Sequence, residues 1–450
     1  MDILIYQVLG KLSGYSNVSY EINGFTEKDV KLSSEALYSF HAKNSHNPKI
    51  IYVCPNSLYS GQNIPEYLTN PVLLEKKFHD EISNISVYRD FDILIINAIG
   101  NYRIDGEEVS FRNTPGNVSI WLFLDMLERI KKCDGRVKLI ADISTGHNIY
   151  IASMLEALRA IIVYDKLRNG LTGKKVDAAY AISEPVIGPD GESSRKIFVN
   201  EYDVKAFFTL PIKTQNFDTL SKLEYYVECG VETKKRIYRE TEDERRRLKN
   251  LLENLVKAFN SIRYNVPLAL YTSVIDFSQD AEILERELVD FLLEVTKPVF
   301  NANRVVATSL KWKDLFNLFY SLALFKWMSN EMGELKKRDR ASITGLKEKI
   351  IQIYTKLDLL LNKRFLERDL SEIYGKKDMI PEEWICLKNL YPEEGRQGPP
   401  SISDSKRNFF AHSGLERTMV EVRKYKEEIE LRYMQEQLET IDKWLLNPED

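Results

Sequence analysis

Apolar residues in the first two hundred positions fall into short, nearly continuous runs that alternate with segments of helical periodicity. The strand candidates are Ile3–Leu9, Lys49–Cys54, Asp92–Asn97, Val137–Ile143 and Val176–Ser183, with a further candidate at Lys196–Tyr202. Such runs are typical of parallel strands that are covered on both faces. The helix candidates between them are Lys28–Lys43, Pro65–Ile82, Val118–Lys131 and Asn148–Leu167. This alternation predicts a doubly wound, Rossmann-like α/β domain.

The predicted helix Asn148–Leu167 is apolar around almost its whole circumference. A helix of this kind is buried on more than one side. We interpret the extra apolar surface as a contact with a second copy of the domain, which predicts a homodimer.

The pattern changes between Phe208 and Ser221, where Pro211, Asn216 and Asp218 interrupt the periodicity. We therefore predict an α/β domain over residues 1–210 and an all-helical region over residues 211–450. A capping box, Thr241 to Glu244, is expected to start the first long helix. Further helices are predicted at Ala281–Lys297, Leu310–Met332, Gly345–Tyr374 and Leu415–Leu446, and the loop 395–400 is the clearest break among them.

Composition narrows the class of protein. A chain of 450 residues is long enough for two or three domains, and its net charge of -4 with a pI near 6.0 excludes a protein coated in positive charge. A nucleic-acid partner would therefore need a local basic patch. The four cysteines form no CxxC pair, so neither a metal site nor a disulfide framework is predicted. With no signal peptide at the N-terminus and no uncharged membrane-length stretch, we expect a cytoplasmic protein that does not contact a membrane.

A short helix near the C-terminus gathers several groups with chemistry. Ser401 is expected to cap it, with Asp404 at the third helical position, and Gly414 is a natural stop just beyond His412. The segment from residue 406 to 412 reads Lys-Arg-Asn-Phe-Phe-Ala-His, and His412 is the only histidine in the second half of the chain.

Arg407, Asn408 and His412 suit the cleavage of RNA without a metal. Asn408 and His412 are four residues apart and share a helix face, whereas Arg407 and His412 are about 140° apart around the axis. Arg407 and His412 therefore converge only if the arginine folds across, or if a second helix supplies the partner. Histidine transfers protons near neutral pH, arginine offers a fixed fork of donors to phosphate, and asparagine orients either group. The alternative is structural, with Phe409 and Phe410 in the core and His412 capping the helix end.

Two loops of the first domain are candidate ligand sites. Asp142-Ile143-Ser144-Thr145-Gly146-His147-Asn148 links the fourth strand to the apolar helix, and Gly10-Lys11-Leu12-Ser13-Gly14 follows the first strand. Ligands of doubly wound sheets bind beyond the carboxyl ends of the strands, where helix N-termini offer N–H groups to phosphates. Neither loop is a standard nucleotide fingerprint, and the run 170–175 is interpreted as a turn before a strand. From the residues alone, the segment 142–148 is equally well explained as a helix cap.

The segment 407–412 resembles the Arg-polar-four-residue-His motif of HEPN ribonucleases. A Rossmann-like sensor ahead of it resembles the CARF–HEPN proteins of type III CRISPR systems, and this resemblance covers essentially the whole chain. It implies that two HEPN domains pair to form one composite, metal-independent ribonuclease site. Sensor domains of this family carry an Asp-x-Thr-His-Gly-x-Asn-like run, which Asp142, Ser144, Gly146 and Asn148 match. Thr145 stands where the family has histidine, and His147 lies two places later.

The resemblance implies a cyclic oligoadenylate as the activator, with cyclic tetra-adenylate expected because its symmetry fits two sensor domains side by side. Gly10, Lys11, Ser13 and the residues Asp142, Ser144, Thr145, Gly146, His147 and Asn148 are the expected contacts. Single-stranded RNA is the expected substrate of a homodimer or an oligomer of dimers, with Arg407 on the phosphate, His412 in proton transfer and cyclic-phosphate ends as products. No cofactor or metal is expected in catalysis.

Two other classes of function remain open from the sequence. The protein is alternatively a ligand-controlled regulator that binds nucleic acid without cutting it, although no convincing helix-turn-helix or basic recognition helix is present. It is otherwise a constitutive, toxin-like ribonuclease whose first domain only dimerises it. RNA cleavage in the absence of ligand would favour the constitutive ribonuclease.

Overall fold

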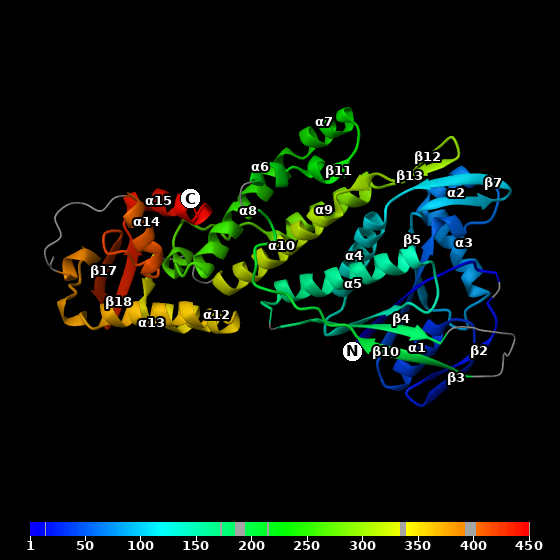
Figure 1. Ribbon diagram of the computed structural model, residues 1–450, viewed down its shortest axis with the longest axis horizontal. Coiled ribbons are helices and arrows are strands. Elements are labelled where there is room, and N and C mark those ends of the chain that lie inside the picture. Colours follow the sequence, from blue (N-terminus) through cyan, green and yellow to red (C-terminus); the bar gives the residue numbers. More distant parts are fainter. Residues whose placement is uncertain are drawn as a thin grey trace.

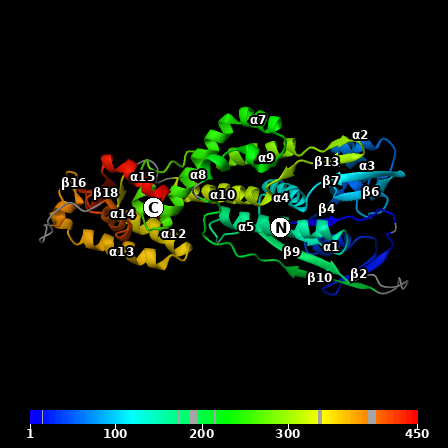
Figure 2. The same ribbon diagram turned by 45° about the horizontal axis from the view of Figure 1, so that its top comes forward.

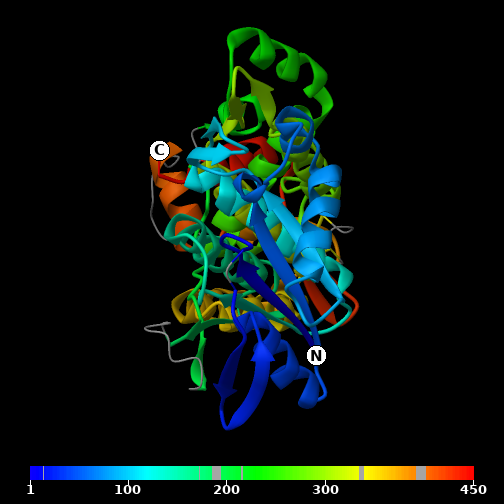
Figure 3. The same cartoon turned by 90° about the vertical axis from the view of Figure 1, so that its right-hand side faces the viewer.

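The computed structural model describes residues 1–13, 15–171, 173–184, 194–213, 216–333, 339–391 and 402–449. The molecule is elongated, with an α/β domain at one end, the C-terminal domain at the other and long helices between them (Figure 1). Seen from the α/β end, these parts lie one behind another along the long axis (Figure 3).

Within the described residues, the α/β domain is built on an eight-stranded sheet with the order β3-β2-β10-β9-β8-β1-β4-β5. The strands are β1 (Asp2–Val8), β2 (Val18–Ile22), β3 (Phe25–Val30), β4 (Asn47–Pro55), β5 (Phe91–Ile96), β8 (Val137–Asp142), β9 (Val176–Ser183) and β10 (Arg195–Glu201). The neighbours β5, β4, β1, β8 and β9 are parallel, and β10 is antiparallel to β9. The predicted doubly wound sheet is confirmed.

Helices cover both faces of this sheet, which is why its central strands are apolar at successive positions. They are α1 (Ser33–Lys43), α2 (Ile64–Thr69), α3 (Pro71–Ser83), α4 (Pro115–Lys132) and α5 (Asn148–Arg168). Ile51 of β4 packs in the core shared with α4 and α5, whereas its neighbour Ile50 packs in the core on the α3 side.

Part of the predicted helix Lys28–Lys43 is wrong, because residues up to Val30 belong to a hairpin of β2 and β3. Asn23 and Gly24 both have positive φ, 49° and 81°, in the turn of this hairpin. The Asn-Gly pair is a strong hairpin signal, and it was overlooked because the run beyond it also fits a helical period.

A second hairpin lies between the strand candidate Asp92–Asn97 and the helix candidate Val118–Lys131, where no element is predicted. Strands β6 (Gly100–Ile104) and β7 (Glu107–Arg112) are joined by Asp105 and Gly106, with φ of 47° and 85°. Strand β13 (Arg304–Val306) pairs in parallel with β7 and antiparallel with β12 (Val299–Asn301). Segments from both sides of the predicted boundary at residue 210 therefore share one small sheet.

Helices form the middle of the molecule. They are α6 (Phe217–Leu220), α7 (Val231–Glu240), α8 (Glu242–Arg263), α9 (Ala281–Val295) and α10 (Trp312–Met332), with short 3-10 turns η3 (Leu223–Tyr226) and η4 (Pro267–Tyr271) and a strand pair β11 (Val227–Glu228) and β14 (Ser309–Leu310). The predicted capping box is wrong. The Thr241 hydroxyl donates to the carbonyl of Ile237 at the end of α7, and no side-chain cap is formed at the start of α8.

The apolar circumference of α5 is covered from within the same chain. Helix α10 lies along α5 and α4 (Figure 2). Phe123 of α4 makes edge contacts with Phe316 and Phe319 of α10. The inference of a dimer from this helix is therefore not supported by its environment. A homodimer has to be argued from other surfaces.

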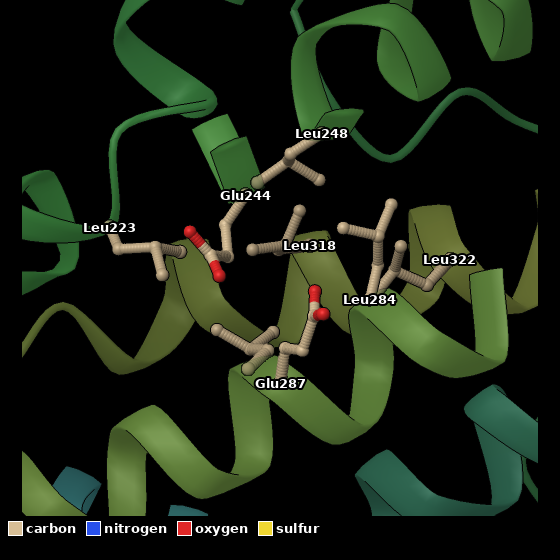
Figure 4. Close-up of a pocket in the computed structure, with 8 residues that line it drawn as sticks. Leu223, Glu244, Leu248, Leu284, Glu287, Leu318 and Leu322 are labelled. Carbon is tan, nitrogen blue, oxygen red and sulfur yellow. The ribbon is translucent and has the colours of Figure 1, made fainter. Parts of the chain in front are cut away.

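A small pocket marks the seam between α8, α9 and α10. Leucines form most of its walls, and the carboxylates of Glu244 and Glu287 point into the pocket (Figure 4). Arg247 donates to Glu287 at 2.9 Å and lies 3.7 Å from Glu244. This seam therefore contains charged groups within an otherwise apolar helix junction.

The C-terminal domain is largely helical but contains a small sheet, β15-β18-β17-β16. Its elements are β15 (Ala341–Ser342), α11 (Ile343–Gly345), α12 (Ile351–Lys356), α13 (Leu360–Tyr374), β16 (Ile385–Cys386), α14 (Ile402–Ala411), β17 (Val420–Tyr425), β18 (Glu428–Tyr433) and α15 (Leu438–Leu446). A π-helical turn, η6 (Leu346–Ile350), connects α11 to α12, and residues 357–359 separate α12 from α13.

The predicted helix Leu415–Leu446 is wrong over its first two thirds, where β17 and β18 form a hairpin. Its apolar residues alternate with charged ones, which is the period of a half-buried strand. The charged residues pair across the strands: Arg423 donates to Glu430 and Arg432 donates to Glu421 at 2.7 Å. Because these arginines and glutamates are charged, the amino-acid composition of the segment resembles that of a solvated helix.

No helix in the described parts of the chain combines the length and the apolar character that crossing a bilayer requires.

We predict that Gly116→Ala destabilises the protein, because a Cβ at this position in α4 would overlap the ring of Trp312 at the start of α10. Overpacking of this kind costs about 1–3 kcal/mol in the free energy of unfolding. Thermal unfolding followed by circular dichroism measures the effect. Gly135→Ala is the matched control, because nothing lies within 4 Å of its added Cβ. Equal melting temperatures for both variants would contradict the prediction.

Candidate functional site

Helix α14 presents the residues expected to carry catalysis. Arg407 and His412 are exposed and Asn408 is half-buried. His412 directly follows the helix, and its N–H donates to the carbonyl of Asn408 at 3.0 Å. Within the described residues, the side chains of Arg407 and His412 have no hydrogen-bond partner, so both are free to meet a substrate. The expected cap at Ser401 and the loop 395–400 lie outside the described residues.

The inner face of α14 fixes the helix to the domain. Phe409 is fully buried, and its ring lies 5.3 Å from that of Trp444 in α15. Phe410 is half-buried against Tyr264. Phe409 therefore lies in the core, as the structural alternative expects. His412 is exposed just beyond the end of the helix.

Helix α14 ends at Ala411, close to the stop that Gly414 predicts. Ser413 and Gly414 have φ of 54° and 69°, and the Gly414 N–H donates to the carbonyl of Phe409 at 2.9 Å. A Cβ at Gly414 would lie 2.6 Å from the Val266 side chain. Gly414 is therefore required both by its backbone conformation and by the close approach of Val266.

A buried hydrogen-bond network holds the residue next to His412. The Ser413 hydroxyl donates to Asp369 of α13 at 2.7 Å and accepts from the Asn265 amide at 2.8 Å. Asn265 in turn accepts from the Tyr354 hydroxyl at 2.9 Å. All four side chains are buried, so each bond replaces one to water. Sequence reasoning missed this network because its members are scattered over about 150 positions.

The two candidate loops of the sensor domain lie side by side. They follow β1 and β8, which are neighbours at the point where the strand order reverses. The Thr145 hydroxyl donates to the carbonyl of Val8 at 3.3 Å. Gly146 has a φ of 105°, and a Cβ there would lie 3.0 Å from Val8. The structure therefore joins the two loops at the switch point, the usual ligand position in doubly wound folds.

Exposure separates the loop residues into two groups. Lys11, Ser13, His147 and Asn148 are exposed, and Gly10, Ser144, Thr145 and Gly146 are half-buried. The Ser144 hydroxyl already accepts the N–H of Ser183 at 2.9 Å. The exposed four are thus the side chains that face solvent beyond the sheet. Gly14, at the end of the first loop, lies outside the described residues.

Asp142 lies beneath its loop rather than on the exposed surface of the loop. Its carboxylate is fully buried, accepting from the Ser33 hydroxyl at 2.6 Å and from the Ser144 N–H at 3.0 Å. Burial raises the pKa of this carboxyl, and the hydrogen bonds from Ser144 and Ser33 oppose that shift. Asp142 therefore supports the loop from beneath, and its contact with a ligand stays a prediction.

Gln7 is a site residue that sequence reasoning missed. It is fully buried in β1, and its amide donates to Thr145 at 3.0 Å and to Ser33 at 3.1 Å. A glutamine inside a strand of otherwise apolar residues was the available signal, because a buried amide requires partners.

No group of three or more His, Cys, Asp or Glu side chains arranged to hold a metal ion occurs in the part of the chain that the structure describes.

Comparison with known families gives two matches. Residues 4–185 match the family model described as "CRISPR system endoribonuclease Csx1, CARF domain", and residues 359–436 match "CRISPR system endoribonuclease Csx1, HEPN domain". The first match contains both sensor loops, and the second contains α13, α14, β17 and β18. No curated protein matches the chain.

We predict that Ser413→Ala destabilises the C-terminal domain and slows RNA cleavage. The change leaves the Asp369 carboxylate and the Asn265 amide with an unpaired hydrogen-bonding group each, at about 1–3 kcal/mol per group. Melting temperature and single-turnover cleavage rate measure the two effects. Ser371→Ala is the control, because its exposed hydroxyl bonds only to the α13 backbone at Glu367. A melting temperature and a rate like those of the control would contradict the prediction.

Proposed function

The chain belongs to the CRISPR-associated CARF–HEPN endoribonucleases, and from this premise we propose that it cuts single-stranded RNA without a metal when cyclic tetra-adenylate binds its sensor domain. The observation that carries the proposal is the surface of α14. Arg407 and His412 are exposed there, and their side chains have no partner among the described residues, while a buried network fixes the helix end.

The chemistry follows from these two side chains. The 2′-oxygen of the RNA attacks the adjacent phosphorus and loses its proton, and the 5′-oxygen leaves with a proton. Histidine serves in this proton transfer, and the Arg407 guanidinium stabilises the charge on the phosphate oxygens. The products then carry a 2′,3′-cyclic phosphate and a 5′-hydroxyl.

A pair of α14 helices suits this reaction better than one. Arg407 and His412 are about 140° apart on the helix, so one copy of α14 does not bring both side chains to the same phosphate. A partner helix supplies the second group. An exposed apolar stripe on the adjacent helix α13, formed by Leu360, Leu361 and Phe365, offers a surface for such pairing. We therefore propose a homodimer that pairs through the nuclease domains.

The activator is proposed to bind at the two joined sensor loops. Lys11 supplies a cation, and the N-terminus of α5 at Asn148 offers backbone N–H groups to phosphates. Two sensor domains side by side present these groups twice, which matches the symmetry of a cyclic tetranucleotide. Activation requires the ligand to bind the active arrangement of the dimer more tightly than the inactive one.

We predict that His412→Ala abolishes cleavage. Loss of a group that transfers protons lowers rates by about 10²–10⁴-fold. The measurement is cleavage of labelled single-stranded RNA in EDTA, with and without cyclic tetra-adenylate, followed by end-group analysis. His79→Ala, which removes an exposed histidine from α3, should retain wild-type activity.

The same assay separates the alternatives. Equal activity with and without ligand would identify a constitutive, toxin-like ribonuclease. Cleavage that EDTA abolishes and divalent ions restore would overturn the metal-independent mechanism.

We predict that Lys11→Ala weakens cyclic tetra-adenylate binding. A hydrogen bond to a charged group contributes about 1.5–3 kcal/mol, which corresponds to a dissociation constant about 10- to 100-fold higher. Isothermal titration calorimetry measures the constant directly. Lys174→Ala removes the same charge just before β9, at the opposite end of the parallel strands, and should bind normally. Identical affinities in both variants would place the activator elsewhere.

A further inference from the structure

An open groove lies beside α7. Helix α7 is on the part of the molecule that projects from the central helices (Figures 1 and 2). The lining residues of the groove are Glu224 of η3 and Lys234, Lys235, Tyr238 and Arg239 of α7. It is far along the chain from the sensor loops, and α14 lies at the other end of α8 (Figure 1). Neither the proposed catalysis nor the proposed activator binding uses this groove.

The positive charges around this groove differ in whether they are neutralised. Arg236 lies 3.9 Å from Glu240, and Arg246 lies 3.0 Å from Asp243, both outside the groove. Of the three groove cations, Lys235 pairs with Glu232 at 2.9 Å, whereas Lys234 and Arg239 have no carboxylate partner among the described residues. Two unneutralised cations against the single carboxylate of Glu224 leave the groove with a local excess of positive charge.

An aromatic ring accompanies these cations. Tyr238 is 43% exposed, and the Arg245 guanidinium lies 3.9 Å from its ring centroid. Cationic side chains together with an exposed aromatic ring are the elements that proteins use to hold single-stranded nucleic acid, through phosphate contacts and base stacking.

Glu224 adds a hydrogen-bond acceptor to the groove. Its Oε2 atom is buried and has no partner within the described residues, although three cationic side chains line the same groove. The amino and imino groups of nucleobases are donors that would satisfy this oxygen. A plain phosphate site would not include such a carboxylate, which favours a ligand with bases as well as phosphates.

We propose that this groove binds single-stranded RNA as a second contact, remote from the catalytic helix. Lys234 and Arg239 hold phosphates, Tyr238 stacks on a base, and Glu224 accepts from a base edge. The groove therefore favours long RNA substrates over short ones, because only a long strand reaches both places. The inference rests on the proposed function for the identity of the strand, and RNA binding tests it without any cleavage.

The test measures fluorescence anisotropy of labelled single-stranded RNA of about 30 and about 6 nucleotides, the shorter within the range of a single binding site. All proteins carry His412→Ala, and no activator is added. The double variant Lys234→Gln, Arg239→Gln is expected to bind the long RNA about 10-fold more weakly. The slope of log affinity against log salt should fall by about 1.4, since each lost phosphate contact on a single strand contributes about 0.7.

The matched control is Arg236→Gln, Arg246→Gln, which removes the same net charge from α7 and α8 outside the groove. It should change the affinity for long RNA less than 2-fold, and Tyr238→Ala should weaken binding without changing the salt slope. Equal losses of RNA affinity in the two double variants would overturn the proposed groove site, because the overall charge of the protein would then explain binding. Unchanged affinity in the groove variant would overturn it as well.

A cleavage assay of the same groove variants in the His412 wild-type background separates this inference from the proposed function. The KM for long RNA should rise while kcat, and the KM for short RNA, stay unchanged. If no RNA is cut under any condition but the binding differences persist, the proposed function fails and the groove stands. If RNA is cut normally and the groove variants match wild type in KM, the groove fails and the proposed function stands.

Discussion

The packing of α10 against the sensor helices is the contact on which the rest of the structure depends. Trp312 at the start of α10 covers Gly116 of α4, and Trp327 near its end covers Gly170 after α5. At both places only a glycine leaves room for the indole ring. Between them Phe316 and Phe319 pack on Phe123, so one apolar helix of the second half belongs equally to the core of the first.

This shared core determines how a signal can travel between the two ends. Helix α9 is tied to the sensor by Glu285, which is buried and accepts from the Tyr164 hydroxyl of α5 and pairs with Lys131 of α4 at 3.0 Å. Helix α8 packs on α9 and α10 and continues to the nuclease domain, where Lys257 pairs with Asp442 of α15 at 2.8 Å. Packed helices therefore connect the sensor domain to the nuclease domain. The seam that contains Glu244 and Glu287 is the least apolar part of this route.

Both candidate sites share one construction. In the sensor, Gln7, Ser33 and Asp142 form a buried polar network beneath the exposed loop residues. In the nuclease domain, Asn265, Asp369 and Ser413 do the same beneath His412. Such networks fix the backbone that carries the exposed groups, because each buried donor and acceptor has few alternative partners. The exposed residues remain free for ligand or substrate.

The sequence by itself determined the sensor fold, the family and the positions of the candidate catalytic residues. The parallel strands are apolar on both faces, and the segment Arg407 to His412 is contiguous, so local patterns identify both. Only the tertiary structure decided that the segment 415–446 begins as a hairpin, because Arg423 and Arg432 pair across strands with glutamates and give it the composition of a helix. It also decided that α10 rather than a second subunit covers α5, and that Asp142 lies under its loop. These outcomes depend on contacts between residues far apart in the chain, which no local periodicity records.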